Sequence, residues 1–250
     1  MPQSIAPRAE PRGQPAAWQR ELAGAVRDVG ELCSLLGLSA ADLPAAAATF
    51  PLIVPRGFVA RMRPEDPRDP LLLQVLPTAA EDRAVDGFSD DPLHEREALA
   101  APGLVQKYAG RALLLAAPGC AVNCRYCFRR EFPYAESGAT RTGIQAALDR
   151  IAADGTLGEV ILSGGDPLLL DDDRLGEIVA RIEAMPHVRR LRIHSRLPIV
   201  LPERVTDALA GLLRGTRLAC VVVVHANHPA ELDASVAAAA ERLAAARAIL

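Results

Sequence analysis

Four apolar segments in the second half of the chain each precede an amphipathic helical pattern, and this alternation limits the fold more than any other feature. Runs of apolar side chains predict buried strands, and apolar residues recurring every three to four positions predict helices. Alternating strands and helices imply an α/β fold, a parallel sheet with right-handed crossovers. The predicted strands are 111–116, 159–163, 191–195 and 218–224, and the predicted helices lie near 141–153, 173–184, 203–213 and 233–249.

Cysteines, glycines and polar residues gather directly after these strands. In α/β sheets and barrels the functional groups lie at the C-terminal ends of the strands. Because these ends meet at one edge of a parallel sheet, we expect a single site there. Its candidates are three cysteines after the first strand, Gly164-Gly165-Asp166-Pro167 after the second, His194-Ser195-Arg196 at the third and His225-Ala226-Asn227-His228 after the fourth.

The chain divides into three regions. Residues 1–15 are polar and proline-rich, which predicts a disordered tail. Residues 16–103 form an N-terminal extension of helices and loops, and residues 104–250 carry about four βα units.

Within the extension, apolar spacing predicts one helix over 18–38. Ser39 can cap a second short helix that runs to Leu43. Residues 71–76 lie between prolines and predict a short strand or extended arm, and residues 77–102 are acidic and loop-like.

Charge and hydropathy exclude several classes of protein. A net charge of −3 argues against an electrostatic nucleic-acid binder. No apolar run reaches the roughly 18–20 residues of a membrane span, and the N-terminus lacks the apolar core of a signal peptide. We therefore expect a cytoplasmic protein, in which the five cysteines are reduced, metal-binding or catalytic.

Cys120, Cys124 and Cys127 are separated by gaps of three and two residues on a predicted loop. Three thiolates can hold a four-iron cluster and leave one iron open for chemistry. A zinc site is the alternative, with a fourth ligand from His225 or Cys220. Cys220 itself lies in a predicted strand and Cys33 in a predicted helix, so buried apolar positions are the simpler interpretation of both.

Other strand-end residues allow two interpretations each. Gly164 and Gly165 let backbone approach a ligand closely, but Gly-Gly-Asp-Pro also suits a plain turn. Strand alternation places Arg192 and His194 on one face and Ile193 and Ser195 on the other, and Arg192 is either near a ligand or in an interior ion pair. Two histidines flanking an asparagine, His225, Asn227 and His228, favour a ribose or adenine contact. In contrast, His94 and His187 are predicted to be solvated in loops.

The Cys-x3-Cys-x2-Cys spacing followed by Phe128 resembles the signature of radical S-adenosylmethionine (SAM) enzymes. Further motifs resemble the lysine 2,3-aminomutase branch. The segment Cys-Ala-Val-Asn-Cys-Arg-Tyr-Cys-Phe-Arg-Arg is most similar to the elongation factor P type of these aminomutases. The resemblance covers residues 18–250. Its motifs are Lys107-Tyr108 with Arg111, Gly119 to Tyr134, Ser163 to Leu168, Arg192 to Pro198 with Leu201 to Arg204, and His225 to Glu231.

This resemblance implies a partial TIM-like (β/α) radical SAM barrel. It implies that Cys120, Cys124 and Cys127 hold a [4Fe–4S] cluster, and that SAM bound to it is cleaved to methionine and a 5′-deoxyadenosyl radical. The implied activity moves the α-amino group of L-lysine to the β-carbon, giving (R)-β-lysine for elongation factor P. The residues implied to contact SAM are Gly164, Gly165, Asp166, Ser195, His225, Asn227 and His228.

The resemblance also implies pyridoxal 5′-phosphate (PLP), with Lys107, Tyr108 and Arg111 near its phosphate and Arg129 on the substrate carboxylate. In the family a lysine in a C-terminal segment holds PLP as a Schiff base. Lys107 is the sole lysine of this sequence and belongs to the phosphate segment. We therefore expect a C-terminally truncated chain that assembles the cluster but forms no internal aldimine, and that exposes an apolar sheet edge after 218–224.

Two alternatives stay open. One is a radical SAM aminomutase for another amino acid, such as glutamate. The other is a non-catalytic domain that holds zinc or a cluster and docks a translation factor. The expected partners are lysine, with a functional link to elongation factor P and its lysyl ligase, and homo-oligomers through the exposed sheet edge are a further expectation.

Overall fold

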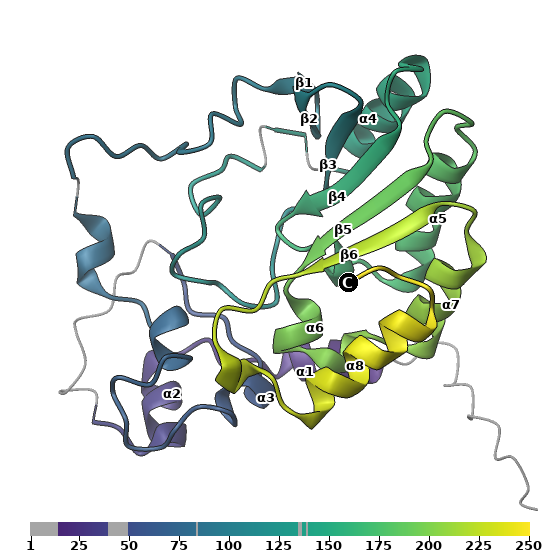
Figure 1. Cartoon of the computed structure of the whole chain (residues 1–250). Helices are drawn as coiled ribbons and strands as arrows, with labels where there is room; N and C mark the ends of the chain where they lie inside the picture. Colours follow the sequence, from purple (N-terminus) through teal and green to yellow (C-terminus); the bar gives the residue numbers. More distant parts are fainter. Residues whose placement is uncertain (1–14, 40–49, 84, 135–136, 139) are drawn as a thin grey trace, which may run out of the picture.

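A computed structural model of the chain describes residues 15–39, 50–83, 85–134, 137–138 and 140–250, and a six-stranded sheet is its centre (Figure 1). The strands lie side by side in chain order, from β1 to β6. The first two pairings, β1 with β2 and β2 with β3, are antiparallel, and the strands from β3 onward are parallel. The strand bounds are β1 (Leu99–Ala101), β2 (Leu104–Tyr108), β3 (Arg111–Ala117), β4 (Glu159–Gly164), β5 (Arg190–Ser195) and β6 (Ala219–Val224). The four predicted parallel strands are confirmed.

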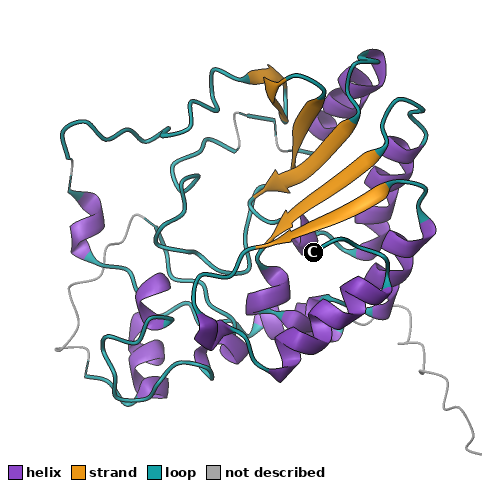
Figure 2. Ribbon diagram, viewed as in Figure 1, coloured by secondary structure: helices purple, strands orange, loops and turns teal. Residues whose placement is uncertain are grey.

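Four helices follow β3, β4, β5 and β6 and pack against one another in chain order (Figure 2). They are α4 (Arg141–Ala153), α5 (Asp172–Glu183), α7 (Asp207–Gly215) and α8 (Ala234–Ala245). Each begins at a side chain that accepts a backbone N–H of the first turn, from Thr140, Asp171, Thr206 and Asp233 in turn. The α/β prediction, with about four βα units as in a partial (β/α) barrel, is therefore confirmed.

The third helix starts later than predicted, because residues 203–206 have another conformation. A 3₁₀ helix, η5 (Pro202–Arg204), comes first, and α7 begins only after the Thr206 cap. Between β5 and η5 lies the one-turn helix α6 (Leu197–Val200).

The two faces of β5 differ as strand alternation predicts. Leu191, Ile193 and Ser195 are buried, whereas Arg192 and His194 are half-buried on the opposite face. Arg192 Nη2 lies 2.7 Å from Glu159 Oε1, so the interior ion pair is the interpretation that the structure supports. His187, predicted to be solvated, is instead half-buried, with Nε2 3.1 Å from the Ile151 carbonyl. His94 is exposed, as predicted.

The prediction of one helix over 18–38 is wrong. Two helices occupy this region, α1 (Ala17–Ala23) and α2 (Val29–Leu36). Between them Val26 pairs with Val54 in an antiparallel bridge, and the Asp28 side chain caps α2. A long-range backbone pairing therefore overrides the local helical spacing.

The prediction of a strand or extended arm over 71–76 is also wrong. This segment contains a 3₁₀ helix, η2 (Leu72–Gln74), because Asp69 Oδ1 accepts the N–H groups of Leu71 and Leu72 at 2.9 and 3.0 Å and starts a turn. The loop predicted over 77–102 contains the 3₁₀ helix η3 (Ala79–Asp82) and ends in β1. Among the described residues of the extension, the remaining short helix is α3 (Arg56–Val59). Of the predicted tail and short helix, residues 1–14 and 40–43 lie outside the described residues.

One hydrophobic core joins the extension to the sheet and helices. Trp18, Leu32 and Phe58 belong to the same buried cluster as Leu162 and Leu209. Arg204 is fully buried, and its guanidinium lies over the Trp18 ring at 4.8 Å. Cys33 and Cys220 are buried, as predicted.

The outer edge of β6 is partly covered, so the expectation of an open edge is only partly met. Val222 N–H donates to the Ile249 carbonyl at 2.8 Å, and Ile249 N–H donates to the Cys220 carbonyl at 3.0 Å. Among the helices of the described residues, none combines the length and the apolar character that crossing a membrane requires.

Candidate functional site

A cavity of about 480 Å³ lies where the C-terminal ends of β3, β4, β5 and β6 meet. Each of these strands, or the loop that follows it, contributes to the wall. The predicted residues that line it are Cys120, Cys124, Cys127, Arg129, Gly164, Gly165, Asp166, Ser195, His225 and Asn227. Further lining residues include Tyr126, Phe128, Ser163, His194 and Arg196.

The three cysteines of the loop after β3 are half-buried free thiols that share this cavity. Burial raises the pKa of Cys124 to about 11 and raises the pKa of Cys120 as well, to which the nearby Asp166 carboxylate also contributes. Within the described residues no three His, Cys, Asp or Glu side chains already converge as a metal site. Three thiols on one loop can nevertheless hold a cluster that leaves one iron open.

Cys220 is not placed to serve as a fourth zinc ligand. Its thiol is buried at β6 and lies 3.7 Å from the Leu213 carbonyl of α7. Burial raises its pKa to about 11, and the residue does not line the cavity. His225 does line the cavity with the three cysteines.

Gly164 and Gly165 allow close approach, but between two backbone segments. A Cβ on Gly165 would lie 2.0 Å from the Gly119 carbonyl oxygen, and one on Gly164 would lie 2.4 Å from the Ala117 carbonyl oxygen. Gly164 also has φ +119°, a conformation that side chains disfavour. The glycines thus let the end of β4 pack onto the segment that enters the cysteine loop.

Asp166 ties the end of β4 to the end of β5. Its buried carboxylate accepts hydrogen bonds from Ser195 Oγ at 2.8 Å and from the backbone N–H of Arg196 at 2.8 Å. The N–H groups of Leu168 and Leu197 also donate to it, at 3.0 and 3.2 Å. Burial raises its pKa to about 6, against the opposing effect of these hydrogen bonds. The side chains of Asp166 and Ser195 therefore hydrogen-bond to each other and to the loop backbone.

Arg129 is buried and already paired with Glu95. Its Nε and Nη2 donate to the two carboxylate oxygens of Glu95 at 2.6 and 2.7 Å. Nη1 donates to Ser163 Oγ at 2.8 Å and to the Gly164 carbonyl at 3.2 Å. Burial acts to lower the pKa of Arg129, but the hydrogen bonds and charge of Glu95 outweigh it and raise the pKa.

Sequence reasoning did not identify Glu95 as part of the site. It lies in the irregular segment before β1, where no periodicity marks it. A buried arginine beside the cysteines requires an acidic partner, but the sequence around 77–102 offers several carboxylates and does not say which one.

The polar residues after β6 separate into two groups. His225 and Asn227 line the cavity. The His225 and His194 rings are arranged edge-to-face, with their centroids 5.9 Å apart. His228 lies outside the lining residues, and its Nδ1 accepts the Ala230 N–H at 3.1 Å at the start of the 3₁₀ helix η6 (Pro229–Glu231). The structure thus assigns His228 a capping contact.

Lys107, Tyr108 and Arg111 lie together, but at the opposite end of β3 from the cysteines. The Arg111 guanidinium lies over the Tyr108 ring at 4.4 Å, and Lys107 Nζ donates to the Leu93 carbonyl. Lys107 and Tyr108 border a shallow hollow beside β1. Two cations and a hydroxyl suit a phosphate dianion chemically, although these residues do not reach the cavity.

The N-terminal extension holds the cysteine loop, which sequence reasoning also missed. Asn123 N–H donates to the Ile53 carbonyl at 3.0 Å, and Arg125 N–H donates to the Gln74 carbonyl at 2.8 Å. The Arg125 side chain forms an ion pair with Glu81, with Nε 3.0 and 3.1 Å from its two oxygens. The loop is therefore fixed from the extension side as well as by β4.

Known proteins are similar to this chain over most of its length. The model of the radical SAM superfamily matches residues 114–220. The L-lysine 2,3-aminomutase of Haemophilus influenzae is 45% identical over 229 residues, which cover 90% of this chain and 68% of that protein. The L-lysine 2,3-aminomutases of Escherichia coli and Buchnera aphidicola are 48% and 43% identical, each over 86% of this chain. The chain covers 64% and 65% of those two relatives, and so spans about two thirds of their length.

Proposed function

The chain belongs to the L-lysine 2,3-aminomutase family of radical SAM enzymes, and from this premise we propose that it moves the α-amino group of L-lysine to the β-carbon. The observation that carries the proposal is the cavity where three thiols, Arg129 and the Gly-Gly-Asp turn of β4 face one another. We further propose that the product is (R)-β-lysine for elongation factor P, made in the cytoplasm.

Cys120, Cys124 and Cys127 would hold a [4Fe–4S] cluster, and the remaining cavity would take SAM. When bound, the cluster and SAM would supply the radical chemistry, and PLP would carry the migrating amino group. Lys107, Tyr108 and Arg111 are the residues that we propose for the PLP phosphate, on the basis of family membership and charge.

In this proposal Arg129 binds the substrate carboxylate. A guanidinium has five N–H groups. The contacts to Glu95, Ser163 and Gly164 engage Nε, Nη1 and one hydrogen of Nη2. One Nη2 hydrogen is left for the substrate while Glu95 stays in place. Glu95 thus fixes the direction in which Arg129 presents its charge.

The buried rings of His194 and His225 favour the neutral form, because the pKa of each is lowered. Burial lowers the pKa of His194 to about 4, helped by His225 and two arginines, and lowers that of His225. The neutral rings therefore add no further cation to the two arginines of the wall, Arg129 and Arg196.

Anaerobic reconstitution with iron and sulfide tests the cluster directly. We expect about four irons per chain, and loss of iron in Cys124→Ala. Tight stoichiometric zinc without iron would instead support a non-catalytic metal-holding domain.

Incubating the reduced, loaded chain with SAM, PLP and either L-lysine or L-glutamate tests the activity and substrate. We expect β-lysine by mass spectrometry, and no β-glutamate. A product from glutamate alone would overturn the proposed substrate. The link to elongation factor P predicts that deleting the gene removes the β-lysyl mass increment from that factor.

A further inference from the structure

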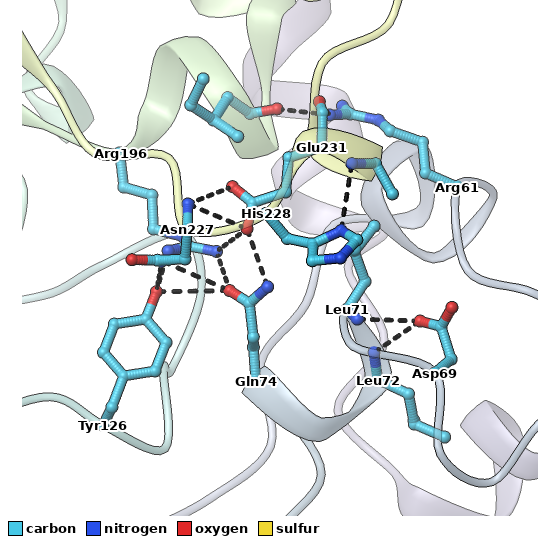
Figure 3. Close-up of polar contacts among 12 residues, drawn as sticks. Arg61, Asp69, Leu71, Leu72, Gln74, Tyr126, Arg196, Asn227, His228 and Glu231 are labelled. Carbon is cyan, nitrogen blue, oxygen red and sulfur yellow. Dashed lines mark hydrogen bonds and ion pairs between the residues drawn. The ribbon is translucent and has the colours of Figure 1, made fainter.

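A polar network with a buried centre includes three residues of the cavity wall (Figure 3). At its centre is Glu231, whose side chain is fully buried. Its Oε1 accepts hydrogen bonds from Gln74 Nε2 at 2.7 Å, from the Asn227 N–H at 3.3 Å and from Arg196 Nη2 at 3.4 Å. A buried carboxylate is tolerated only with such partners.

The Gln74 amide uses both of its ends in this network. Nε2 donates to Glu231, and Oε1 accepts from Arg196 Nη2 at 2.6 Å. Oε1 also lies 3.4 Å from Tyr126 Oη and from Asn227 Nδ2. An amide suits this position because it donates to the carboxylate and accepts from the cation, which neither a carboxylate nor an apolar group can do.

Three members of the network face the cavity and two lie behind it. Tyr126, Arg196 and Asn227 line the wall, and the Tyr126 hydroxyl hydrogen-bonds to the side chains of the other two. Gln74 and Glu231 do not line it, although both contact residues that do.

The network joins segments that are distant in the sequence. Gln74 belongs to η2 in the N-terminal extension, Tyr126 lies between the second and third cysteines, and Glu231 ends η6. The Gln74 backbone carbonyl also accepts the Arg125 N–H. From the extension, Arg61 Nη1 donates to the Glu231 carbonyl at 2.8 Å and so anchors the backbone of η6.

We propose that Gln74 and Glu231 are positioning residues that set the orientation of Tyr126, Arg196 and Asn227 in the wall of the SAM site. The proposal rests on the proposed function, because it takes SAM as the occupant of the cavity. It makes the N-terminal extension part of the cofactor site, although none of its residues is a metal ligand in the proposal.

Exchanging the two side chains tests the proposal. Gln74→Glu alone places a second carboxylate beside Glu231, and Glu231→Gln alone leaves Arg196 without its buried carboxylate. The double variant Gln74→Glu/Glu231→Gln restores one carboxylate, one amide and the contact to Arg196. The readout is the dissociation constant of SAM, from its effect on the electron paramagnetic resonance spectrum of the reduced cluster.

We expect each single variant to weaken SAM binding about tenfold or more, and the double variant to bind within about threefold of the unaltered chain. Asp172→Asn is the matched control. Asp172 Oδ1 lies 2.9 Å from Nη2 of the buried Arg204, and neither residue lines the cavity. It should lower thermal stability and leave SAM affinity unchanged. Single variants that bind SAM normally, or a double variant no better than Gln74→Glu, would overturn the proposal.

Hydrogen–deuterium exchange on the cluster-free chain separates this proposal from the proposed function. We expect the peptide containing residues 120–127 to exchange faster in Gln74→Glu than in the unaltered chain, and to recover in the double variant. Failure of the unaltered chain to bind SAM would refute the proposed function alone. Equal exchange in all variants would refute the positioning role alone.

Discussion

Arg129 and Glu95 show at the residue scale how a buried charge determines its surroundings. Their side chains are 7% and 6% exposed and form a bidentate pair. Taking either charge out of water is compensated chiefly by the other. Removing one partner therefore affects stability as well as any ligand that Arg129 binds.

We predict that Glu95→Ala lowers the free energy of unfolding by about 3–5 kcal/mol, because it leaves a buried guanidinium unpaired. Urea denaturation measures this difference. Glu131→Ala is the control, since Glu131 is half-exposed in its 3.1 Å pair with Arg130 and should contribute less than about 1 kcal/mol. Similar losses in the two variants would show that the Glu95 pair is not effectively buried.

His194 predicts a pH dependence of stability. Burial, His225 and nearby arginines lower its pKa in the folded chain to about 4, from an ordinary value near 6.5. Between these values the unfolded chain binds more protons, so stability falls as the pH falls through this window. We expect His194→Gln to flatten this part of the curve of unfolding free energy against pH. An unchanged slope would contradict the assignment.

At the scale of elements, the contact between the end of β4 and the cysteine loop decides whether the thiols can share one cavity. Gly165 N–H donates to the Ala117 carbonyl and Asp166 N–H donates to the Gly119 carbonyl, both at 2.8 Å. These bonds require the two backbones to approach more closely than a side chain at Gly165 permits.

We predict that Gly165→Ala displaces the cysteine loop, because its new Cβ would lie 2.0 Å from the Gly119 carbonyl oxygen. Iron content after reconstitution should fall to a minor fraction, with a loss of about 1–3 kcal/mol in stability. Gly155→Ala is the matched control, as nothing lies within 4 Å of its added Cβ. Full iron content in Gly165→Ala would mean that the loop tolerates the shift.

At the scale of the whole molecule, the extension and the βα units share one core. Residues from α1, α2 and α3 pack in the same hydrophobic cluster as residues from the sheet and its helices. A shared core favours one cooperative unfolding transition.

We therefore predict that fluorescence of Trp18, the single tryptophan, and far-ultraviolet circular dichroism report the same urea midpoint. Trp18 lies in α1 and reports on the extension, whereas most of the dichroism comes from the βα units. A fluorescence transition at clearly lower urea would show that the extension unfolds independently of the sheet.

Local patterns predicted the part of the fold that repeats. The strands from β3 to β6 and their helices follow from apolar periodicity, and α4 occupies Arg141–Ala153 as that spacing predicts. In the extension the same patterns failed at Val26 and at residues 71–76, because a bridge to Val54 and the Asp69 turn outweighed local spacing.

By itself the sequence determined the α/β class, the three-cysteine loop and the edge of the sheet where the site forms. Each of these depends on the spacing of residues that are close together in the sequence. The tertiary structure alone decided which residues stand behind the site. Arg129 pairs with Glu95, which is 34 positions away in the sequence, and Gln74 pairs with Glu231, which is 157 positions away. Buried polar groups must be paired wherever the fold brings a partner, and no local pattern records which partner that is.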